Sequence, residues 1–132
     1  ELPVCIPVKK DAYLVGRHGI KKEGKIWTLT DVLTDQVLYF TCRTSAVTYS
    51  ICYQTGHLKI AHEMHTHDSA ILQFREELEN FSYSMSKARR KKDWWRVDHF
   101  TNLSSQVESR LLAAKDRLEK TINLAKYFKI WE

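Results

Sequence analysis

Residues 68–92 read DSAILQFREELENFSYSMSKARRKK, and this stretch carries the strongest structural pattern in the chain. Its apolar side chains recur at alternating intervals of three and four residues, which places them along one side of an α-helix. Asp68 suits the N-cap position, Glu76, Glu77 and Glu79 lie in the N-terminal half of the stretch, and five cationic side chains crowd its C-terminal end, as the helix macrodipole favours. The pattern predicts a helix over about residues 69–92. Its apolar stripe comprises Ile71, Phe74, Leu78, Phe81, Met85 and Ala88.

A second stripe with the same spacing lies nearer the C-terminus. Ser105-Gln106-Val107-Glu108 has the form of a capping box and predicts the start of another helix, with the chain turning over residues 93–103. Thr121 interrupts the stripe at one position. The apolar members of this second stripe are Val107, Leu111, Ala114, Leu118, Ala125 and Phe128.

Two such helices would each be about 36 Å long at the usual rise per residue, which is longer than a small sheet requires. We therefore expect one or both helices to extend beyond the sheet. They can pair as a helical hairpin, or one can carry its stripe to another subunit as a coiled-coil extension, which would make the protein an oligomer. Packing of the helices on the sheet would explain the same spacing.

The first half of the chain has a different character. All four glycines and both prolines lie within residues 1–56, where short runs of Val, Ile, Thr, Tyr and Cys alternate with turn residues, as in β-strands. Residues 18–24 and 55–56 have the composition of hairpin connections, which favours an antiparallel meander. The expected strands lie near residues 4–8, 12–17, 25–30, 36–43, 47–54 and 57–65.

The chain is thus predicted to have an α+β fold, in which an N-terminal antiparallel β-meander of about five or six strands precedes two long α-helices. Residues 1–67 are expected to be mainly β and residues 68–132 mainly α. A length of 132 residues suits a single domain. No segment approaches the roughly 20 consecutive apolar residues of a membrane-spanning helix, so we expect no transmembrane segment.

The cysteines Cys5, Cys42 and Cys52 are odd in number and include no Cys-x-x-Cys pair. We interpret them as reduced thiols that act as small apolar side chains, which favours a cytoplasmic or nuclear location. A disulfide between Cys42 and Cys52 stays open, because both residues lie in neighbouring predicted strands.

The main candidate site is a basic and aromatic cluster at the end of the first predicted helix. Cationic side chains neutralise phosphates, and tryptophans stack on bases or lie at headgroup depth in an anionic membrane. A solvated helix end with tryptophan folded into the core has the same composition, although two adjacent helical tryptophans cannot both face one core. The predicted partner- or phosphate-binding residues are Lys87, Arg89, Arg90, Lys91, Lys92, Trp94, Trp95 and Arg96.

A second basic group lies on and beside the predicted loop at residues 18–24 and comprises Arg17, His18, Lys21, Lys22 and Lys25. The segments KIWTLTD (residues 25–31) and VLYF (residues 37–40) look like the second and third strands of pleckstrin-homology domains. That resemblance, which covers residues 25–40, implies a seven-stranded domain whose basic hairpin loop holds inositol phosphates.

Four histidines, His57, His62, His65 and His67, lie close together. His65 and His67 are weak candidates for zinc ligands, because residues two apart on a strand project from the same face. Thr66 occupies the second histidine position of a His-Glu-x-x-His motif, so that motif is incomplete. We interpret the histidines as solvated strand-end side chains, and we predict neither a metal nor a cofactor.

Motifs that indicate catalysis are missing from the sequence. It has no Gly-x-Ser-x-Gly elbow, no phosphate-binding Gly-rich loop and no dinucleotide fingerprint. We therefore predict a non-catalytic interaction or adaptor module that binds a protein partner or self-associates through its long helices. The alternative, favoured by a net charge of +5, is a domain that binds nucleic acid, phosphoinositides or an acidic membrane surface through residues 87–96.

Overall fold

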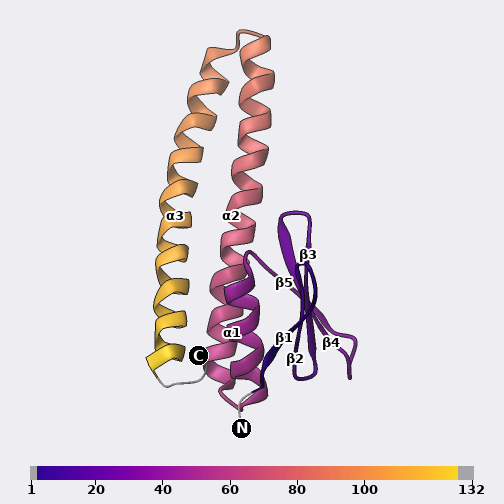
Figure 1. The fold of residues 1–132 in the computed structure, drawn as a ribbon. Helices are drawn as coiled ribbons and strands as arrows, with labels where there is room; N and C mark the ends of the chain where they lie inside the picture. Colours follow the sequence, from indigo (N-terminus) through magenta and orange to yellow (C-terminus); the bar gives the residue numbers. More distant parts are fainter. Residues whose placement is uncertain (1–2, 128–132) are drawn as a thin grey trace.

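The computed structural model describes residues 3–127 as a five-stranded antiparallel sheet followed by three α-helices (Figure 1). The α+β class, the N-terminal β-meander and the two long helices are therefore confirmed. The strands are β1 (Cys5–Lys9), β2 (Ala12–Val15), β3 (His18–Glu23), β4 (Ile26–Asp31) and β5 (Val37–Phe40). The helices are α1 (Arg43–Gln54), α2 (Leu58–Arg90) and α3 (Trp94–Tyr127).

The strands pair in chain order, each antiparallel to the next. Side chains alternate across a strand, so one face of the sheet packs on the helices and the other faces solvent. The inner face contributes Val15, Ile20, Leu29 and Phe40, which are almost completely buried. These residues form the apolar surface on which α1 packs.

Helix α1 lies between the inner face of the sheet and the two long helices (Figure 1). One core cluster joins the inner face of the sheet to α1, to Ala61 of α2 and to Ala125 of α3. Small side chains allow α1 to fit into this confined space. Its buried residues are Ser45, Ala46, Val47, Thr48, Ser50, Ile51 and Cys52.

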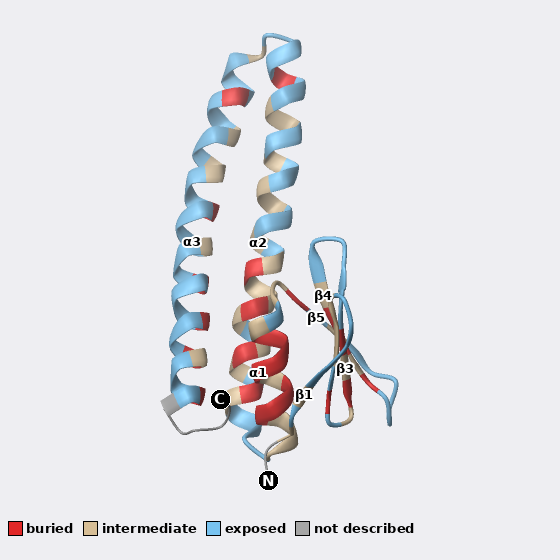
Figure 2. Ribbon diagram, in the orientation of Figure 1, coloured by how far each residue is buried: buried red, intermediate tan, exposed pale blue. Residues whose placement is uncertain are grey.

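The two long helices run antiparallel and form a helical hairpin that extends well beyond the sheet (Figure 1), which confirms one of the predicted arrangements. Near the sheet, Met64 and Ile71 of α2 pack with Ala114 and Leu118 of α3. Burial becomes sparse toward the far end of the hairpin (Figure 2). The two predicted apolar stripes therefore face each other; Phe128, the last member of the second stripe, lies outside the described residues.

The strands expected at residues 47–54 and 57–65 are wrong, because these residues belong to α1 and to the first turns of α2. The helical segment therefore starts at Arg43, rather than at residue 68. A short helix that is buried on most sides lacks the apolar periodicity of a surface helix. Its sequence therefore cannot be distinguished from that of a buried strand. In the helix, Tyr49 and Tyr53 are one turn apart and stack with their ring centroids 5.9 Å apart.

The predicted helix starts are also wrong, whereas the predicted end of the first helix, near residue 92, agrees with the end of α2 at Arg90. Helix α2 begins at Leu58, and α3 begins at Trp94, so Asp68 and Ser105 lie inside helices and cap neither. The turn between the helices is confined to residues 91–93. No glycine or proline interrupts these segments. The two helices pack against each other, and this packing stabilises the helical conformation even at residues, such as Asp68 and Ser105, that often cap a helix.

Residues 18–23 form strand β3, so the hairpin loop predicted over residues 18–24 is wrong. The segments that resemble pleckstrin-homology strands do pair as neighbouring antiparallel strands, β4 and β5. However, the sheet has five strands within residues 3–127, and three helices follow it. The seven-stranded domain that the resemblance implies is therefore not the observed fold.

All three cysteines lie in the described part of the chain and are free. Cys42 is the N-cap residue of α1, and Cys52 lies within the same helix. Ten helical residues separate them by about 15 Å, too far for the disulfide that the sequence left open. Burial raises the pKa of the Cys52 thiol to about 11, so this side chain is a neutral member of the core.

Candidate functional site

Two groups of polar side chains are candidates for a functional site, and the first is a buried network where the sheet contacts α1. It consists of Arg17, His18, Asp31, Ser50 and Gln54. Asp31 accepts hydrogen bonds from Nε and Nη2 of Arg17 at 3.0 and 2.7 Å. His18 Nδ1 lies 2.7 Å from Ser50 Oγ, and Gln54 Nε2 donates to the same oxygen at 2.8 Å. The network thereby joins two strands of the sheet to α1.

Backbone groups fix the orientation of the Gln54 amide. Its Nε2 donates to the carbonyl oxygen of Val15 at 2.7 Å, and its Oε1 accepts from the backbone N–H of Arg17 at 3.0 Å. A carbonyl can only accept and an N–H can only donate, so the amide cannot be reversed. Gln54 therefore donates to Ser50 Oγ, and the same oxygen shares a second hydrogen bond with His18 Nδ1, whose direction is set by the tautomer of the imidazole.

The surroundings of His18 favour its neutral form, because the side chain is almost completely buried. Its Nε2 lies 3.7 Å from Oδ2 of Asp31. Burial lowers the pKa of His18 and outweighs the opposite effect of the nearby Asp31 carboxylate. Burial alone would raise the pKa of Asp31, but hydrogen bonds from the Leu33 amide and the Arg17 guanidinium lower it. The network thus pairs one ionised carboxylate with Arg17 and keeps the imidazole uncharged.

Serine, histidine and aspartate side chains that lie next to one another also form the catalytic triad of acyl-transfer enzymes. Here Ser50 is completely buried, and the cavity beside His18 and Asp31 measures about 10 Å³. That space is close to the volume of one water molecule, so no substrate reaches the hydroxyl in this conformation. We assign the network a structural role: it fastens the β2–β3 turn to α1.

The second gathering of polar side chains is the far end of the α2–α3 hairpin, residues 84–100, which we call the hairpin tip. Helix α2 ends at Arg90, and Lys92 adopts the left-handed conformation with φ 57°. The amide of Asp93 then donates to the carbonyl oxygen of Ala88 at 2.9 Å. Asp93 Oδ1 accepts from the amide of Arg96 at 3.3 Å and caps the start of α3. These bonds reverse the chain within three residues.

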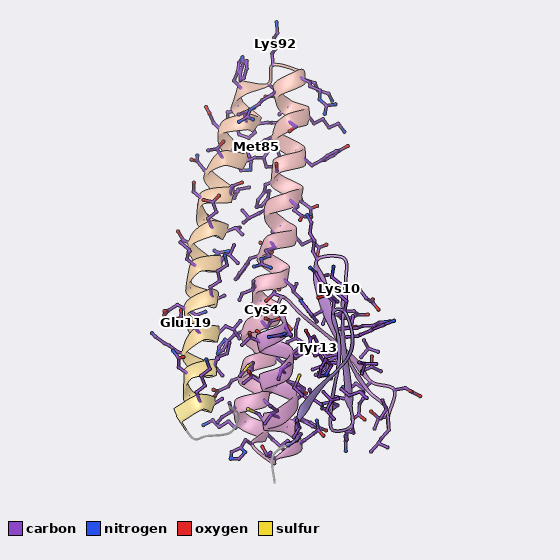
Figure 3. All side chains as sticks on the ribbon, in the orientation of Figure 1. Lys10, Tyr13, Cys42, Met85, Lys92 and Glu119 are labelled. Carbon is purple, nitrogen blue, oxygen red and sulfur yellow. The ribbon has the colours of Figure 1, made fainter. Side chains whose placement is uncertain are left out.

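The hairpin tip concentrates positive charge. Residues 87–96 contain six cationic side chains and one acidic one, Asp93, so this segment alone carries as much charge as the chain's net +5. Only Arg96 among these cations forms an ion pair in the described structure, with its Nε 3.2 Å from Oδ2 of Asp93. The side chain of Lys92 projects from the very end of the hairpin (Figure 3). Clustered like charges repel one another, so an anionic partner would relieve this repulsion.

Both tryptophans of the tip are exposed. Trp94 is 60% and Trp95 is 73% accessible to solvent, so the interpretation in which a tryptophan folds into the core is wrong. Trp95 lies nearly parallel to the imidazole of His99, with ring centroids 5.3 Å apart and an interplanar angle of 7°. The tip therefore offers aromatic surface beside its cationic side chains.

An open pocket of about 310 Å³ lies between the two helices at the tip. Three of the six cations of residues 87–96 line it, together with one tryptophan. The lining residues are Ser84, Lys87, Ala88, Lys91, Asp93, Trp95, Arg96, His99 and Phe100. A single ligand in this pocket would touch cationic and aromatic groups at the same time.

The histidine cluster is not on a strand: His57 is the N-cap residue of α2, and the other three histidines lie within that helix. Two residues apart on a helix, His65 and His67 point in nearly opposite directions and do not share a face. His65 packs edge-on against Phe40, and burial lowers its pKa. Within residues 3–127, no group of three or more His, Cys, Asp or Glu side chains is placed to hold a metal ion.

The second basic group does not form one surface. Arg17 precedes β3 and binds Asp31, whereas Lys25 follows β3 at the opposite end of the strand. Between them, Lys21 pairs with Glu23 at 3.1 Å, and neighbouring lysines of a strand point to opposite faces. These cations are dispersed over the sheet.

The residues of the tip form a contiguous cluster in the sequence, whereas the sequence does not indicate the buried network. Its members come from the β2–β3 turn, from β4 and from α1, so no local spacing indicates it. Sequence reasoning also missed a groove of about 650 Å³ between the sheet and the middle of α2. Its lining includes Lys25 and Arg75 as well as Glu76 and Glu79, so it has no preferred sign of charge.

Among the described residues, no helix is both long enough and apolar enough to cross a lipid bilayer. Of all the features described above, the hairpin tip combines the most exposed charge with the most exposed aromatic surface. No protein-family model, curated protein or solved structure is significantly similar to this chain.

Proposed function

We propose that this chain is a non-catalytic module that binds single-stranded nucleic acid through its hairpin tip. The observation that supports this proposal is the presence of five cationic side chains without an ionic partner next to two exposed tryptophans. Lysine and arginine neutralise phosphates, and exposed indole rings stack on unpaired bases. The five cations are Lys87, Arg89, Arg90, Lys91 and Lys92.

The pocket at the tip favours nucleic acid over an acidic membrane. A membrane-bound tryptophan inserts its ring among lipids, whereas Trp95 lies flat against His99 and lines a pocket together with cations. A nucleotide presents a flat base and a phosphate a short distance apart, which suits such a pocket. Duplex bases are already stacked on one another, so a single strand is the better ligand.

The two apolar stripes give less support to self-association through the helices. They face each other in the hairpin, where Ile71 and Leu118 are buried. A second copy of the chain would therefore have to use another surface.

A binding assay with a fluorescent single-stranded oligonucleotide tests the proposal. The triple variant Arg89→Glu, Arg90→Glu, Lys91→Glu should lower affinity at least tenfold for all base sequences, because these residues contact phosphates and do not read bases. Raising the salt concentration should weaken binding of the unmodified chain, as release of counterions requires.

The matched control reverses three exposed cations of α3, namely Arg110→Glu, Lys115→Glu and Arg117→Glu. It changes the net charge of the chain by the same amount but leaves the tip intact, so affinity should change by less than about threefold. Equal losses of affinity in both triple variants would show a general effect of net charge and would disprove the proposal. Binding to acidic vesicles but not to oligonucleotides would assign the tip to membranes instead.

A second candidate function, closer to the prediction of an interaction module, is self-association through the outer face of the sheet. Ile6, Leu14, Gly19, Thr30 and Val37 form one row in register across all five strands. Its three large apolar side chains are all exposed on the face that the helices leave uncovered. Exposed apolar patches of this kind are typical of protein interfaces.

Light scattering coupled to size-exclusion chromatography tests this second candidate. A dimer at micromolar concentration that Leu14→Lys converts to a monomer would support it, because the lysine would place a charge in the middle of the row. A strictly monomeric parent chain would exclude it.

A further inference from the structure

We infer that the pocket at the hairpin tip is a site for one nucleotide unit, with the phosphate held by Lys87, Lys91 and Arg96 and the base stacked on Trp95. This inference rests on the proposed function and specifies the part of the ligand that enters the pocket. The remaining cations of the tip would then contact neighbouring phosphates of the strand.

The cations of the pocket come from both helices. Lys87 and Lys91 are four residues apart on α2 and therefore lie on the same face of that helix, one turn from each other. Arg96 is in the first turns of α3 and lines the same pocket. An anion between the helices is thus within reach of three cationic side chains, of which α2 alone provides two.

Asp93 is the acidic residue of the pocket, and its position determines how Arg96 is used. Its carboxylate binds Nε of Arg96 at 3.2 Å and also accepts from the amide of Arg96. A guanidinium has five N–H donors, so this ion pair leaves the terminal nitrogens of Arg96 free for a phosphate. Asp93 therefore holds Arg96 in place and neutralises only part of the positive charge of the pocket.

The aromatic part of the pocket is held in a fixed orientation. Trp95 stacks on His99 at 7°, and His99 in turn contacts the ring of Phe100 at a centroid distance of 5.6 Å. Phe100 packs on Phe81 of α2, 6.0 Å away, so the series of rings reaches across the hairpin. A base that stacks on Trp95 would extend a preformed series of rings.

The size of the pocket limits the ligand. A volume of about 310 Å³ lies at the small end of the range for ligand sites, which suits one nucleotide and not a duplex. The pocket also divides the basic cluster into two equal groups. Lys87, Lys91 and Arg96 line it, whereas Arg89, Arg90 and Lys92 do not. The two groups carry the same charge, so variants of one are matched controls for variants of the other.

The decisive experiment follows the indole N–H signals of the ¹⁵N-labelled chain during titration with adenosine 5′-monophosphate. The Trp95 signal, assigned with a Trp95→Phe variant, should shift with a saturable dependence on concentration. Ribose 5-phosphate and adenosine, which each lack one of the two groups, should bind at least about fivefold more weakly. Inorganic phosphate should shift the Trp95 signal least.

The triple variant Lys87→Ala, Lys91→Ala, Arg96→Ala should weaken binding of the mononucleotide at least tenfold, and Arg89→Ala, Arg90→Ala, Lys92→Ala should weaken it less than twofold. The unchanged dispersion of the amide signals serves as the check that both variants fold. Equal effects of the two triples, or no shift of Trp95, would overturn the nucleotide site. If oligonucleotide binding still depended on the tip in that case, the proposed function would stand without the pocket; loss of both would remove both.

Discussion

Asp68, in the first third of α2, binds the backbone and the side chain of Thr41, which connects the sheet to α1. The amide of Thr41 donates to Oδ2 at 2.8 Å, and its hydroxyl donates to Oδ1 at 2.7 Å. Asp68 is completely buried; burial raises its pKa, although the hydrogen bonds from Thr41 and Ser45 act in the opposite direction. This single carboxylate fixes the point at which the chain leaves β5 and enters α1.

Replacement of Asp68 by alanine should destabilise the fold by roughly 2–4 kcal/mol, because each buried donor left without an acceptor costs about 1–3 kcal/mol. Asp68→Asn should cost clearly less, since its carbonyl oxygen can accept from the Thr41 amide and its NH₂ group can donate to the Thr41 hydroxyl. Urea unfolding measures both. Asp116→Ala, which removes an exposed partner of Lys120, is the control and should change stability by less than about 1 kcal/mol. Equal losses for Asp68→Ala and Asp116→Ala would contradict this role.

Gly16 is required by the buried network. Its φ is +56°, and an added Cβ would clash with Oε1 of Gln54. Gly24 has a similar φ of +64° but open space around it. Both alanine variants should therefore lower the unfolding free energy by about 1–2 kcal/mol, the cost of a left-handed backbone at a residue with a side chain. Gly16→Ala should lower it by roughly 1–3 kcal/mol more, because Gln54 is displaced from its hydrogen bonds. In a Gln54→Ala background, the excess cost at Gly16 should disappear from the unfolding free energy; its persistence would show that another contact is responsible.

The stability of the fold should depend on pH through its buried histidines. Burial lowers the pKa of both His18 and His65 below the ordinary value of 6.5. The unfolded chain then binds protons that the folded chain excludes, so the unfolding free energy should be largest above pH 6.5 and fall as pH decreases through the folded-state pKa values. Asp68 acts in the opposite sense, because its raised pKa favours the protonated folded state at low pH.

Urea unfolding at a series of pH values from 8 to 5 isolates the contribution of His18. The variant His18→Asn, whose amide can donate to or accept from Ser50, should be less stable than the parent at pH 8 but should lose less stability on acidification. The same change at the exposed His57 is the control. A parent and a His18→Asn variant with identical pH slopes would show that His18 does not control this dependence.

Lys92 has a left-handed backbone conformation that an L side chain rarely adopts. Lys92→Gly should therefore raise the unfolding free energy by about 0.5–1 kcal/mol, even though it removes a proposed phosphate contact. Lys92→Ala removes the same charge but keeps the backbone cost, so it should gain less. Thermal and urea unfolding distinguish the two; if Lys92→Gly is not more stable than Lys92→Ala, the left-handed conformation carries no cost.

The sequence alone determined the broad plan of the molecule. Breaker residues in the first half and their absence later predicted a sheet followed by long helices. The three-four spacing from Ile71 to Ala88 is a property of the helix itself, so it located the face that packs in the hairpin. The basic and aromatic cluster of the tip was also visible, because its residues are contiguous in the chain.

Only the tertiary structure decided where the helices begin and which residues contact one another at the hairpin tip. Helix α1 is rich in residues that favour strands, yet it is buried between the sheet and the hairpin, and that burial outweighs local preference. Asp68 looked like a helix cap, but its partner Thr41 is brought to it by the packing of α2 beside β5. The pocket that separates Lys87 and Lys91 from Arg89 and Arg90 exists only once α3 folds back on α2. Contacts between distant segments depend on how the elements pack, and that information is not contained in any local pattern of residues.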